Sequence, residues 1–210
     1  MALRILVTAG PTREHVDPVR FLSNESSGRM GFAIAAAAQA RGHQVTLVAG
    51  PVALDTPRGV RRVDVVSARD MLWAVRREFG RADALVMAAA VADWRPRRQL
   101  RGKWRAKDGG AQRVTLALVR NPDILATVAR AKGRQLVMGF ALETGRGEAR
   151  ARRKLHRKHL DWIVLNDPSA LRGARSQVVV LGRDGSRRAW PAQAKSVTAR
   201  ALVRLLEAPR

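Results

Sequence analysis

The 210-residue sequence predicts an α/β fold, in which helices cover both faces of a parallel β-sheet, with a small β-hairpin extension. Short apolar runs alternate along the chain with runs whose apolar residues recur at helical spacing. The run at residues 84–89 (ALVMAA) is apolar throughout, as strands are when both faces of a sheet are covered. This alternation is typical of a doubly wound, Rossmann-like sheet.

Each expected strand is a short apolar run bounded by polar or turn residues. The expected strands lie, in chain order, at residues 3–9, 44–50, 60–66, 84–89, 113–119, 135–141 and 162–166. Helices are expected at residues 30–40, 68–79, 122–131, 148–159 and 194–206. Arg183, Asp184 and Gly185 separate two further strand-like runs and form the turn of the hairpin extension. No internal repeat or linker interrupts the pattern, so residues 1–210 are interpreted as a single domain.

The composition excludes several kinds of site. Cysteine is absent, which excludes disulfides, thiolate metal ligands and a cysteine nucleophile. The four histidines show no metal-site spacing with carboxylates, and no G-x-S-x-G motif occurs. No apolar run approaches the roughly 20 residues of a membrane span, and the N-terminus lacks a signal-peptide pattern. A cytoplasmic protein without membrane contact is therefore expected.

The chain carries a formal net charge of +23, from 40 basic and 17 acidic residues. One interpretation is a nucleic-acid-binding protein, because cations that contact phosphates release counterions. Aromatic residues, which stack on bases, make up only 4% of the chain, and the arginines are scattered through every segment. The composition therefore favours a general attraction for anionic ligands over specific recognition of a nucleic acid.

Residues 10–29 form a long polar segment between the first expected strand and the first expected helix. Strand-to-helix loops are commonly about 2–6 residues long, so a segment of this length predicts a binding role. The dinucleotide-binding motif G-x-G-x-x-G is absent, because the next glycine after Gly10 is Gly28. Ser26, Ser27 and Gly28 precede the helix, where they would either cap it and present backbone amides to an anion or only cap it.

Two other segments each have a binding interpretation and a structural one. Residues 88–94 (AAAVADW) follow an expected strand, and their small side chains would let a ligand approach the backbone beside Asp93. Tight packing against a helix would explain the same residues equally well. Residues 102–110 (GKWRAKDGG) place basic side chains between glycines, which suits either a phosphate-binding lid or a solvated loop.

The sequence around Pro122 predicts the start of a helix, with Asn121 as N-cap and Pro122 at the first position. Lys154 and Lys158 lie four positions apart and therefore share one face of a later helix. Lysine is scarce in this basic chain, and the only ones are Lys103, Lys107, Lys132, Lys154, Lys158 and Lys195. A compact ammonium suits a phosphate, so this pair predicts anion binding, against the alternative of a solvated face.

Taken together, these stretches resemble one family. They are TAGPTRE, DPVRF, SN-x-SSG-x-MG, AAAVADW, K-x-R in a loop, NPDIL and GFALET, then K-x-x-x-K and D-x-I-x-x-ND. In this order they resemble the bacterial phosphopantothenate–cysteine ligase, also called phosphopantothenoylcysteine synthetase. The resemblance runs over residues 4–167 and more loosely to the end. In many bacteria this ligase is the C-terminal half of a bifunctional coenzyme A biosynthesis flavoprotein.

The resemblance implies a reaction that joins 4'-phosphopantothenate to L-cysteine, with CTP as co-substrate and Mg²⁺ as cofactor. The pantothenate carboxylate would attack the α-phosphate of CTP, giving an acyl-cytidylate and pyrophosphate. The cysteine amine would then displace CMP. The resemblance also implies a homodimer with its sites near the subunit interface, and no bound flavin. No decarboxylase domain is recognised, so a separate phosphopantothenoylcysteine decarboxylase is a candidate partner.

The resemblance also implies roles for individual positions. Asn24 would contact the activated acyl group, and Lys103 would be a catalytic lysine on a flap at about residues 94–113. The implied nucleotide-binding residues are Met87, Ala88, Ala89, Asp93, Lys103, Pro122, Asp123, Ile124, Leu125, Phe140, Lys154 and Lys158. The implied substrate-binding residues are Gly10, Asn24, Ser27, Gly28 and Ala90. The metal ligands are unknown.

The flap departs from the family pattern of lysine, aliphatic, lysine, lysine. Here it reads Lys103, Trp104, Arg105 and Ala106. The first lysine is kept, so activity is expected, whereas flap movement and the preference for CTP over ATP stay open. One alternative is a nucleotide-binding or basic DNA-associated module that has lost catalysis, against which the intact motifs argue. A dehydrogenase-like enzyme is the other, against which the missing glycine motif argues.

Overall fold

A computed structural model describes residues 1–105, 113–142, 147–166, 173 and 175–208. Its centre is an eight-stranded sheet with the strand order β12-β11-β10-β9-β6-β1-β4-β5. The strands are β1 (Arg4–Ala9), β4 (Gln44–Ala49), β5 (Arg61–Asp64), β6 (Ala84–Met87), β9 (Leu136–Leu142), β10 (Trp162–Asn166), β11 (Arg175–Gly182) and β12 (Arg187–Ala194). The strands from β5 to β10 in this order pair in parallel, which confirms the predicted α/β class.

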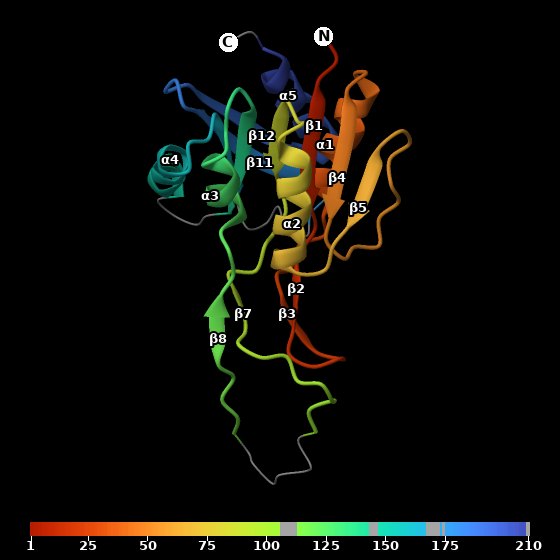
Figure 1. Ribbon diagram of the computed structural model, residues 1–210. Helices are drawn as coiled ribbons and strands as arrows, with labels where there is room; N and C mark the ends of the chain where they lie inside the picture. Colours follow the sequence, from red (N-terminus) through yellow and green to blue (C-terminus); the bar gives the residue numbers. More distant parts are fainter. Residues whose placement is uncertain (106–112, 143–146, 167–172, 174, 209–210) are drawn as a thin grey trace.

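Helices cover both faces of the sheet (Figure 1). Helices α1 (Arg29–Ala40) and α5 (Lys195–Glu207) pack on one face, and the other face is covered by α2 (Ala68–Phe79), α3 (Ile124–Ala129) and α4 (Gly147–Arg157). Adjacent strand residues point to opposite faces. Ile5 and Val7 therefore join the α1/α5 core, whereas Leu6 joins the other core.

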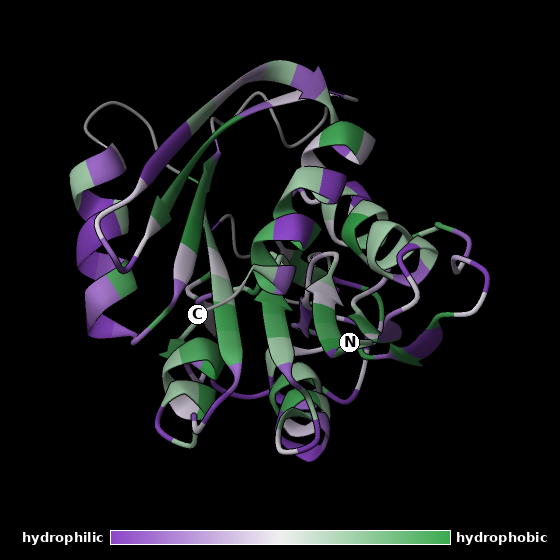
Figure 2. Ribbon diagram, turned by 90° about the horizontal axis from the view of Figure 1, so that it is seen from above, coloured by the Kyte–Doolittle hydropathy of each residue, from purple (hydrophilic) through white to green (hydrophobic). Residues whose placement is uncertain are grey.

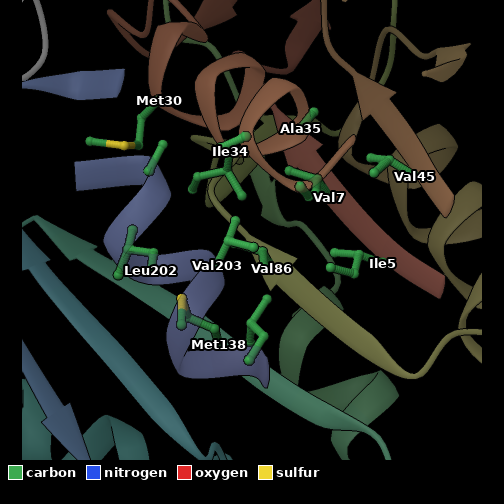
Figure 3. Close-up of a cluster of buried hydrophobic side chains, with 14 of the residues drawn as sticks. Ile5, Val7, Met30, Ile34, Ala35, Val45, Val86, Met138, Leu202 and Val203 are labelled. Atoms are coloured by element: carbon green, nitrogen blue, oxygen red, sulfur yellow. The ribbon is translucent and has the colours of Figure 1, made fainter. Parts of the chain in front are cut away.

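The sheet strands are apolar because both of their faces are buried. Seen from above in Figure 2, the central strands are green, the colour of hydrophobic residues, and much of the periphery is purple. Figure 3 shows side chains of the α1/α5 core, in which Ile34 from α1 and Val203 from α5 meet Val7 and Val86 from the sheet. These four side chains are fully buried. This packing fixes the strand ends on which the candidate site is built.

Two short antiparallel ribbons lie outside the sheet. One pairs β2 (Arg13–His15) with β3 (Phe21–Ser23), and the other pairs β7 (Trp94–Pro96) with β8 (Leu118–Arg120). Figure 1 shows that the β7–β8 ribbon and the adjoining segments extend well beyond the sheet and its helices.

The predicted strand at residues 113–119 is therefore wrong in both extent and place. Only Leu118–Arg120 pairs, and it pairs with β7 rather than with the sheet. Val114 is 64% exposed, so the apolar residues of this run do not enter the core. Apolar residues in alternate positions fit a two-stranded ribbon as well as a strand of the buried sheet. For this reason the alternation at residues 113–119 did not distinguish the two.

The predicted hairpin is confirmed, and it extends the main sheet. Strand β11 pairs antiparallel with β10 and with β12, and Gly185 turns the chain between β11 and β12 with a φ of +87°. A left-handed backbone of this kind favours glycine. The hairpin therefore forms the edge of the sheet beside α5, whose first residue follows β12 directly.

Candidate functional site

The candidate site lies at the point in the sheet where the order in which successive strands are added reverses. From β1 the chain builds β4 and β5 on one side, and it then returns to build β6 and β9 on the other. The segments that leave adjacent strands β1 and β6 diverge at such a switch point, which is where doubly wound proteins bind ligands. Residues 10–28 follow β1 and residues 88–93 follow β6, so both predicted binding segments lie at this edge.

A first cavity, of about 470 Å³, lies beside the end of β6, the start of α3 and one face of α4. All the predicted nucleotide-binding residues except Ala88 and Lys103 line it. Val91, Ala92, Trp94, Arg120 and Asn121 complete the lining. The first three belong to the segment 88–94 that was given a binding interpretation, whereas Asn121 was expected only as an N-cap and Arg120 had no predicted role.

A second cavity, of about 630 Å³, lies at the N-terminus of α1. Four of the predicted substrate-binding residues line it, namely Asn24, Ser27, Gly28 and Ala90. Ala88 lies here rather than in the first cavity. The two cavities share part of their walls, because both are lined by Ala89, Val91, Asp93, Phe140 and Lys154. Two ligands bound in them would therefore lie against the same side chains.

Hydrogen bonds from the segment after β1 hold the shared wall in place. The Ala89 amide donates to Thr8 Oγ1 at 3.2 Å, and the Ala92 amide donates to Thr12 Oγ1 at 3.0 Å. Both threonines are fully buried. Asn24 Nδ2 donates to the carbonyls of Ala90 at 3.2 Å and Val91 at 3.1 Å. Asn24 is thus fixed at the second cavity by the segment that follows β6.

Gly10 lines neither cavity, and its contacts explain why it is a glycine. Its φ is +77°, and its carbonyl accepts a hydrogen bond from the Ala90 amide at 2.9 Å. A Cβ added at Gly28, which has a φ of +74°, would lie 3.3 Å from the Gly10 backbone. The two glycines let the start of α1 approach the end of β1 closely. Contact between Gly10 and a substrate stays a prediction.

Neither Ser26 nor Ser27 is the N-cap residue of α1, contrary to one interpretation of these serines. The N-cap residue is Gly28, which makes no side-chain capping hydrogen bond. Ser26 Oγ instead accepts from the Gly28 amide at 3.3 Å, just before the helix. This end of α1 lines the second cavity.

The start of α3 also differs from the prediction. Asp123, not Asn121, is the N-cap, and its Oδ1 accepts from the Ala126 amide at 3.0 Å. Asn121 Nδ2 donates to the Ala92 carbonyl at 2.8 Å, so it ties the segment before α3 to the segment after β6. The helix starts later because Asp123 reaches the third residue ahead, as N-cap side chains do.

Lys154 on α4 and Lys158, which directly follows the last residue of α4, both line the first cavity. Lys154 Nζ donates to the Phe140 carbonyl at 2.7 Å, and Lys158 Nζ pairs with Asp123 Oδ2 at 2.8 Å. Burial raises the pKa of Asp123, but the hydrogen bonds from Lys158 and the Ala126 amide and the charges of both lysines outweigh it. The pKa therefore lies below its ordinary value of 3.8. Both lysines thus have structural contacts as well as a place on the cavity wall.

Lys103 is exposed and lines neither cavity. Its neighbour Trp104 is held by the turn between β2 and β3, since the Trp104 amide donates to Asp17 Oδ2 at 3.0 Å. The rest of the predicted flap, residues 106–112, lies outside the described residues. The catalytic role of Lys103 stays a prediction.

Few carboxylates are available for a metal ion. Among the described residues, no group of three or more His, Asp or Glu side chains is arranged to hold one. Asp93 and Asp123 are the carboxylates that line the first cavity, and Asp123 is paired with Lys158. Mg²⁺ is commonly held by one or two carboxylates together with substrate phosphates. The residues present therefore fit a metal ion that arrives with a nucleotide, with Asp93 as a candidate ligand.

Three residues that line the second cavity were given no binding role from the sequence. They are Arg29 at the start of α1, Asn166 at the end of β10 and Lys195 at the start of α5. Asn166 belongs to the D-x-I-x-x-ND motif, and Lys195 is one of the chain's scarce lysines. The motif around Asn166 and the scarcity of lysine could be seen in the sequence. Only the fold brings the starts of α1 and α5 to the end of β10.

Parallel strands that end at a switch point, with two joined cavities beyond them, define a doubly wound α/β ligand-binding protein. The model of the family "DNA/pantothenate metabolism flavoprotein C-terminal domain" matches residues 1–208. The chain belongs to this family.

Two curated relatives support the assignment. The chain is 50% identical over 168 residues to the coenzyme A biosynthesis bifunctional protein CoaBC of Escherichia coli K12, a match that covers 80% of the chain and 41% of that protein. It is 43% identical over 196 residues to CoaBC of Bacillus subtilis 168, covering 91% of the chain and 48% of that protein. The chain thus spans less than half the length of these relatives.

Solved structures agree with the fold. A crystal structure of the C-terminal domain of CoaBC superimposes with a TM-score of 0.85 at 40% identity, covering 98% of this chain and 94% of that one. The Cab2 variant H337A in complex with phosphopantothenate-cysteine superimposes with a TM-score of 0.77 at 15% identity, covering 98% and 86%. At that identity the second match shows the shared fold alone. The resemblance to the C-terminal half of a bifunctional coenzyme A biosynthesis protein is confirmed.

No helix in the described part of the chain is long and apolar enough to cross a membrane. The cytoplasmic location stays a prediction.

Proposed function

We propose that the protein is a phosphopantothenate–cysteine ligase of coenzyme A biosynthesis, which uses CTP and forms an acyl-cytidylate. The observation that carries the proposal is the shared wall of the two cavities at the switch point. A reaction between a nucleotide and a carboxylic acid needs the two reactants side by side, and positioning of this kind supplies much of a catalysed rate. The family membership and the CoaBC relatives support the same activity.

In the first step, the carboxylate of 4'-phosphopantothenate attacks the α-phosphorus of CTP. A bond forms between the carboxylate oxygen and phosphorus, and pyrophosphate leaves with the electrons of the broken P–O bond. The resulting acyl-cytidylate has CMP as a good leaving group. In the second step, the amine of L-cysteine attacks the acyl carbon, CMP leaves, and the amide forms with loss of a proton.

The first cavity is the proposed nucleotide site. Lys154 and Lys158 present positive charge to it, which suits a triphosphate and stabilises the charge that develops on the leaving pyrophosphate. Asp93 lies on the shared wall, where Mg²⁺ carried by the phosphates could meet it. Bound Mg²⁺ would neutralise phosphate charge and polarise the phosphoryl group under attack.

The second cavity is the proposed acid site. Asn24 is held at its edge by the carbonyls of Ala90 and Val91, so an acyl group on the shared wall would lie within its reach. Small side chains at Ala88, Ala89 and Ala90 leave room for a ligand against the backbone. Closure of the flap that carries Lys103 would protect a hydrolysable intermediate from water.

The direct test is release of pyrophosphate from the purified chain. With phosphopantothenate and Mg²⁺, we expect pyrophosphate with CTP and much less with ATP, and we expect CMP and the amide only when L-cysteine is added. Asn24→Asp should slow the cysteine-dependent step more than pyrophosphate release. A chain that binds CTP but releases no pyrophosphate would instead be a module that has lost catalysis. Equal turnover of CTP and ATP would contradict the proposed nucleotide preference.

A further inference from the structure

A third cavity, of about 950 Å³, lies over α2 and the β7–β8 ribbon. Five of the residues that line it are arginines, and no described residue of its lining is acidic. The five are Arg69, Arg76 and Arg77 from α2, Arg95 from β7 and Arg120 from β8. We call this cavity the arginine groove. Its volume is typical of small-molecule sites.

The groove uses the face of α2 that is turned away from the sheet. Arg69, Trp73 and Arg76 are spaced by four and three positions, so they lie on one face of the helix. The opposite face buries residues such as Met71 and Val75 in the core. Packing on the sheet therefore requires none of the three groove residues.

The positive charge of this face is only partly neutralised. Arg77 Nε pairs with Glu78 Oε1 at 3.0 Å. In the described part of the chain, the side chains of Arg69 and Arg76 make no ion pair or hydrogen bond, and both residues are exposed. Like charges gathered on one surface repel one another, and the field that they create attracts anions. A bound anion would relieve the repulsion.

Arg95 is held in place on the other side of the groove. Its Nη1 donates to the Arg120 carbonyl and to Asn121 Oδ1, the latter at 3.2 Å. A guanidinium has five N–H donors, so Arg95 keeps donors for a ligand after these two bonds. A cation that is already oriented loses less conformational entropy when it binds.

Trp73 adds an aromatic ring to the arginine groove. The residue is 64% exposed, and the Cζ atom of Arg77 lies 4.6 Å from the ring centroid. A single exposed apolar residue is common on proteins, but this one lies in a cavity among guanidinium groups. Aromatic rings stack on nucleobases, and guanidinium groups bind phosphates through paired hydrogen bonds.

We infer that the arginine groove is a second nucleotide site, which binds a nucleoside polyphosphate with its base stacked on Trp73 and its phosphates on the arginines. Arg77 covers one face of the ring, so the base stacks on the opposite face. A nucleic-acid strand is bound by a series of stacking rings along a groove. Trp73 is the one aromatic ring among the described lining residues, which favours a single nucleotide.

This site is separate from the first cavity, although the two adjoin. Residues 120–122 line both of them. Lys154 and Lys158 line the first cavity and not the groove, whereas Trp73 and Arg76 line the groove and not the first cavity. Each site thus has its own cations, and substitutions can address one site at a time.

The test is titration calorimetry of the parent and its variants with ATP and with inorganic tripolyphosphate, which lacks a base. Trp73→Leu should weaken ATP binding about five- to a hundredfold, the range for loss of one stacked base, and should leave tripolyphosphate binding unchanged. Arg76→Gln should weaken the binding of both ligands several-fold, and the loss should shrink as salt is added. Arg81→Gln is the control, because it removes an exposed cation that follows α2 and does not line the groove. It should change neither affinity.

Lys158→Met distinguishes the two sites and makes the test independent of any catalytic activity. It should keep the ATP binding that Trp73→Leu weakens. If Lys158→Met abolished ATP binding while Trp73→Leu left it intact, ATP would bind in the first cavity alone, and the inference would be wrong. Equal weakening of ATP and tripolyphosphate by Trp73→Leu would remove the base contact.

Two further results would also contradict the site. A parent protein that binds neither ATP nor tripolyphosphate would show that the groove takes no free anion, as when a second copy of the chain covers it. A short oligothymidylate that bound far more tightly than ATP, and that lost this affinity in Trp73→Leu, would make a nucleic-acid strand the ligand instead.

Discussion

The carboxylate of Asp17 accepts a hydrogen bond from the backbone amide of Trp104 at 3.0 Å, across a wide separation in sequence. Arg20 strengthens the link, because its Nη1 donates to Asp17 Oδ2 at 3.0 Å and also to the Trp104 carbonyl. Asp17 is fully buried and further accepts from the Val19 and Arg20 amides. The turn between β2 and β3 thus holds the backbone next to Lys103.

We predict that Asp17→Asn loosens this attachment without unfolding the sheet. The asparagine keeps the shape but replaces one acceptor oxygen by an N–H₂ group, which cannot accept from both Trp104 and Arg20. Trypsin should then cleave after Lys103 or Arg105 several-fold faster than in the parent, because local opening controls cleavage.

Asp64→Asn is the matched control, because it removes a carboxylate that pairs with Arg62 on the surface. Its cleavage rate should equal that of the parent. Equal rates for Asp17→Asn and the parent would show that the link does not restrain the flap.

The same carboxylate predicts a pH dependence of stability. Burial raises the pKa of Asp17, but three backbone amides and the charge of Arg20 outweigh it and lower the pKa from 3.8 to about 2. The folded state therefore binds this proton less readily than the unfolded state. The resulting stabilisation is complete above about pH 4 and is lost as the pH falls toward 2.

Urea denaturation followed by tryptophan fluorescence at pH 5, 4 and 3 measures this contribution. The parent should have a higher free energy of unfolding than Asp17→Asn at pH 5, and the difference should shrink as the pH falls. The other carboxylates with lowered pKa values are present in both proteins, so their effect cancels. A difference that stayed constant with pH would contradict the assignment to Asp17.

The strands of the sheet could be predicted because burial on both faces demands apolar residues throughout. Leu85 and Val86 face opposite cores and are both fully buried, so periodicity is not needed to recognise their strand. The ribbons could not be predicted in this way. They are short and partly polar, and their place depends on distant bonds such as that from the Arg13 amide to the Val66 carbonyl at 2.8 Å.

The same distinction applies to the site. Asp93 could be proposed because it follows the predicted strand that became β6, in a segment of small residues. Asn24 was assigned only through the family resemblance. Lys195 could not be proposed, because it lies far along the chain, at the start of a helix that joins the cavity only through its packing on α1. Its burial is a property of the assembled fold. Lysine scarcity was a signal, but it did not say which lysine was buried.

A homodimer is predicted, with the two ribbons at the interface. Large apolar side chains are exposed on them, including Val19 at 59%, Trp94 at 45% and Leu118 at 41%. Light scattering at micromolar concentration should give about twice the 23.0 kDa mass of the chain. Leu118→Asp should weaken the dimer, whereas Val197→Asp on α5 should not. A monomeric parent with full activity would contradict both the dimer and its role.

Finally, Lys154 and Lys158 are predicted to bind CTP in addition to supporting the fold. Their contacts with the Phe140 carbonyl and Asp123 mean that Lys→Met variants lose some stability. Asp123 is 49% exposed, so loss of its pair should cost no more than about 1 kcal/mol. Loss of a phosphate contact should instead weaken CTP binding about ten- to a hundredfold.

The two effects can be separated by thermal melting with and without CTP. Lys154→Met and Lys158→Met should melt slightly below the parent without ligand, and CTP should protect them much less. Lys132→Met is the control, because Lys132 also pairs with a carboxylate, that of Asp161 at 2.6 Å, but lines neither cavity. It should lose stability and keep the full protection by CTP. If CTP protected Lys154→Met and Lys158→Met as well as it protects Lys132→Met, the two lysines would serve the fold alone, and the nucleotide would have to bind without them.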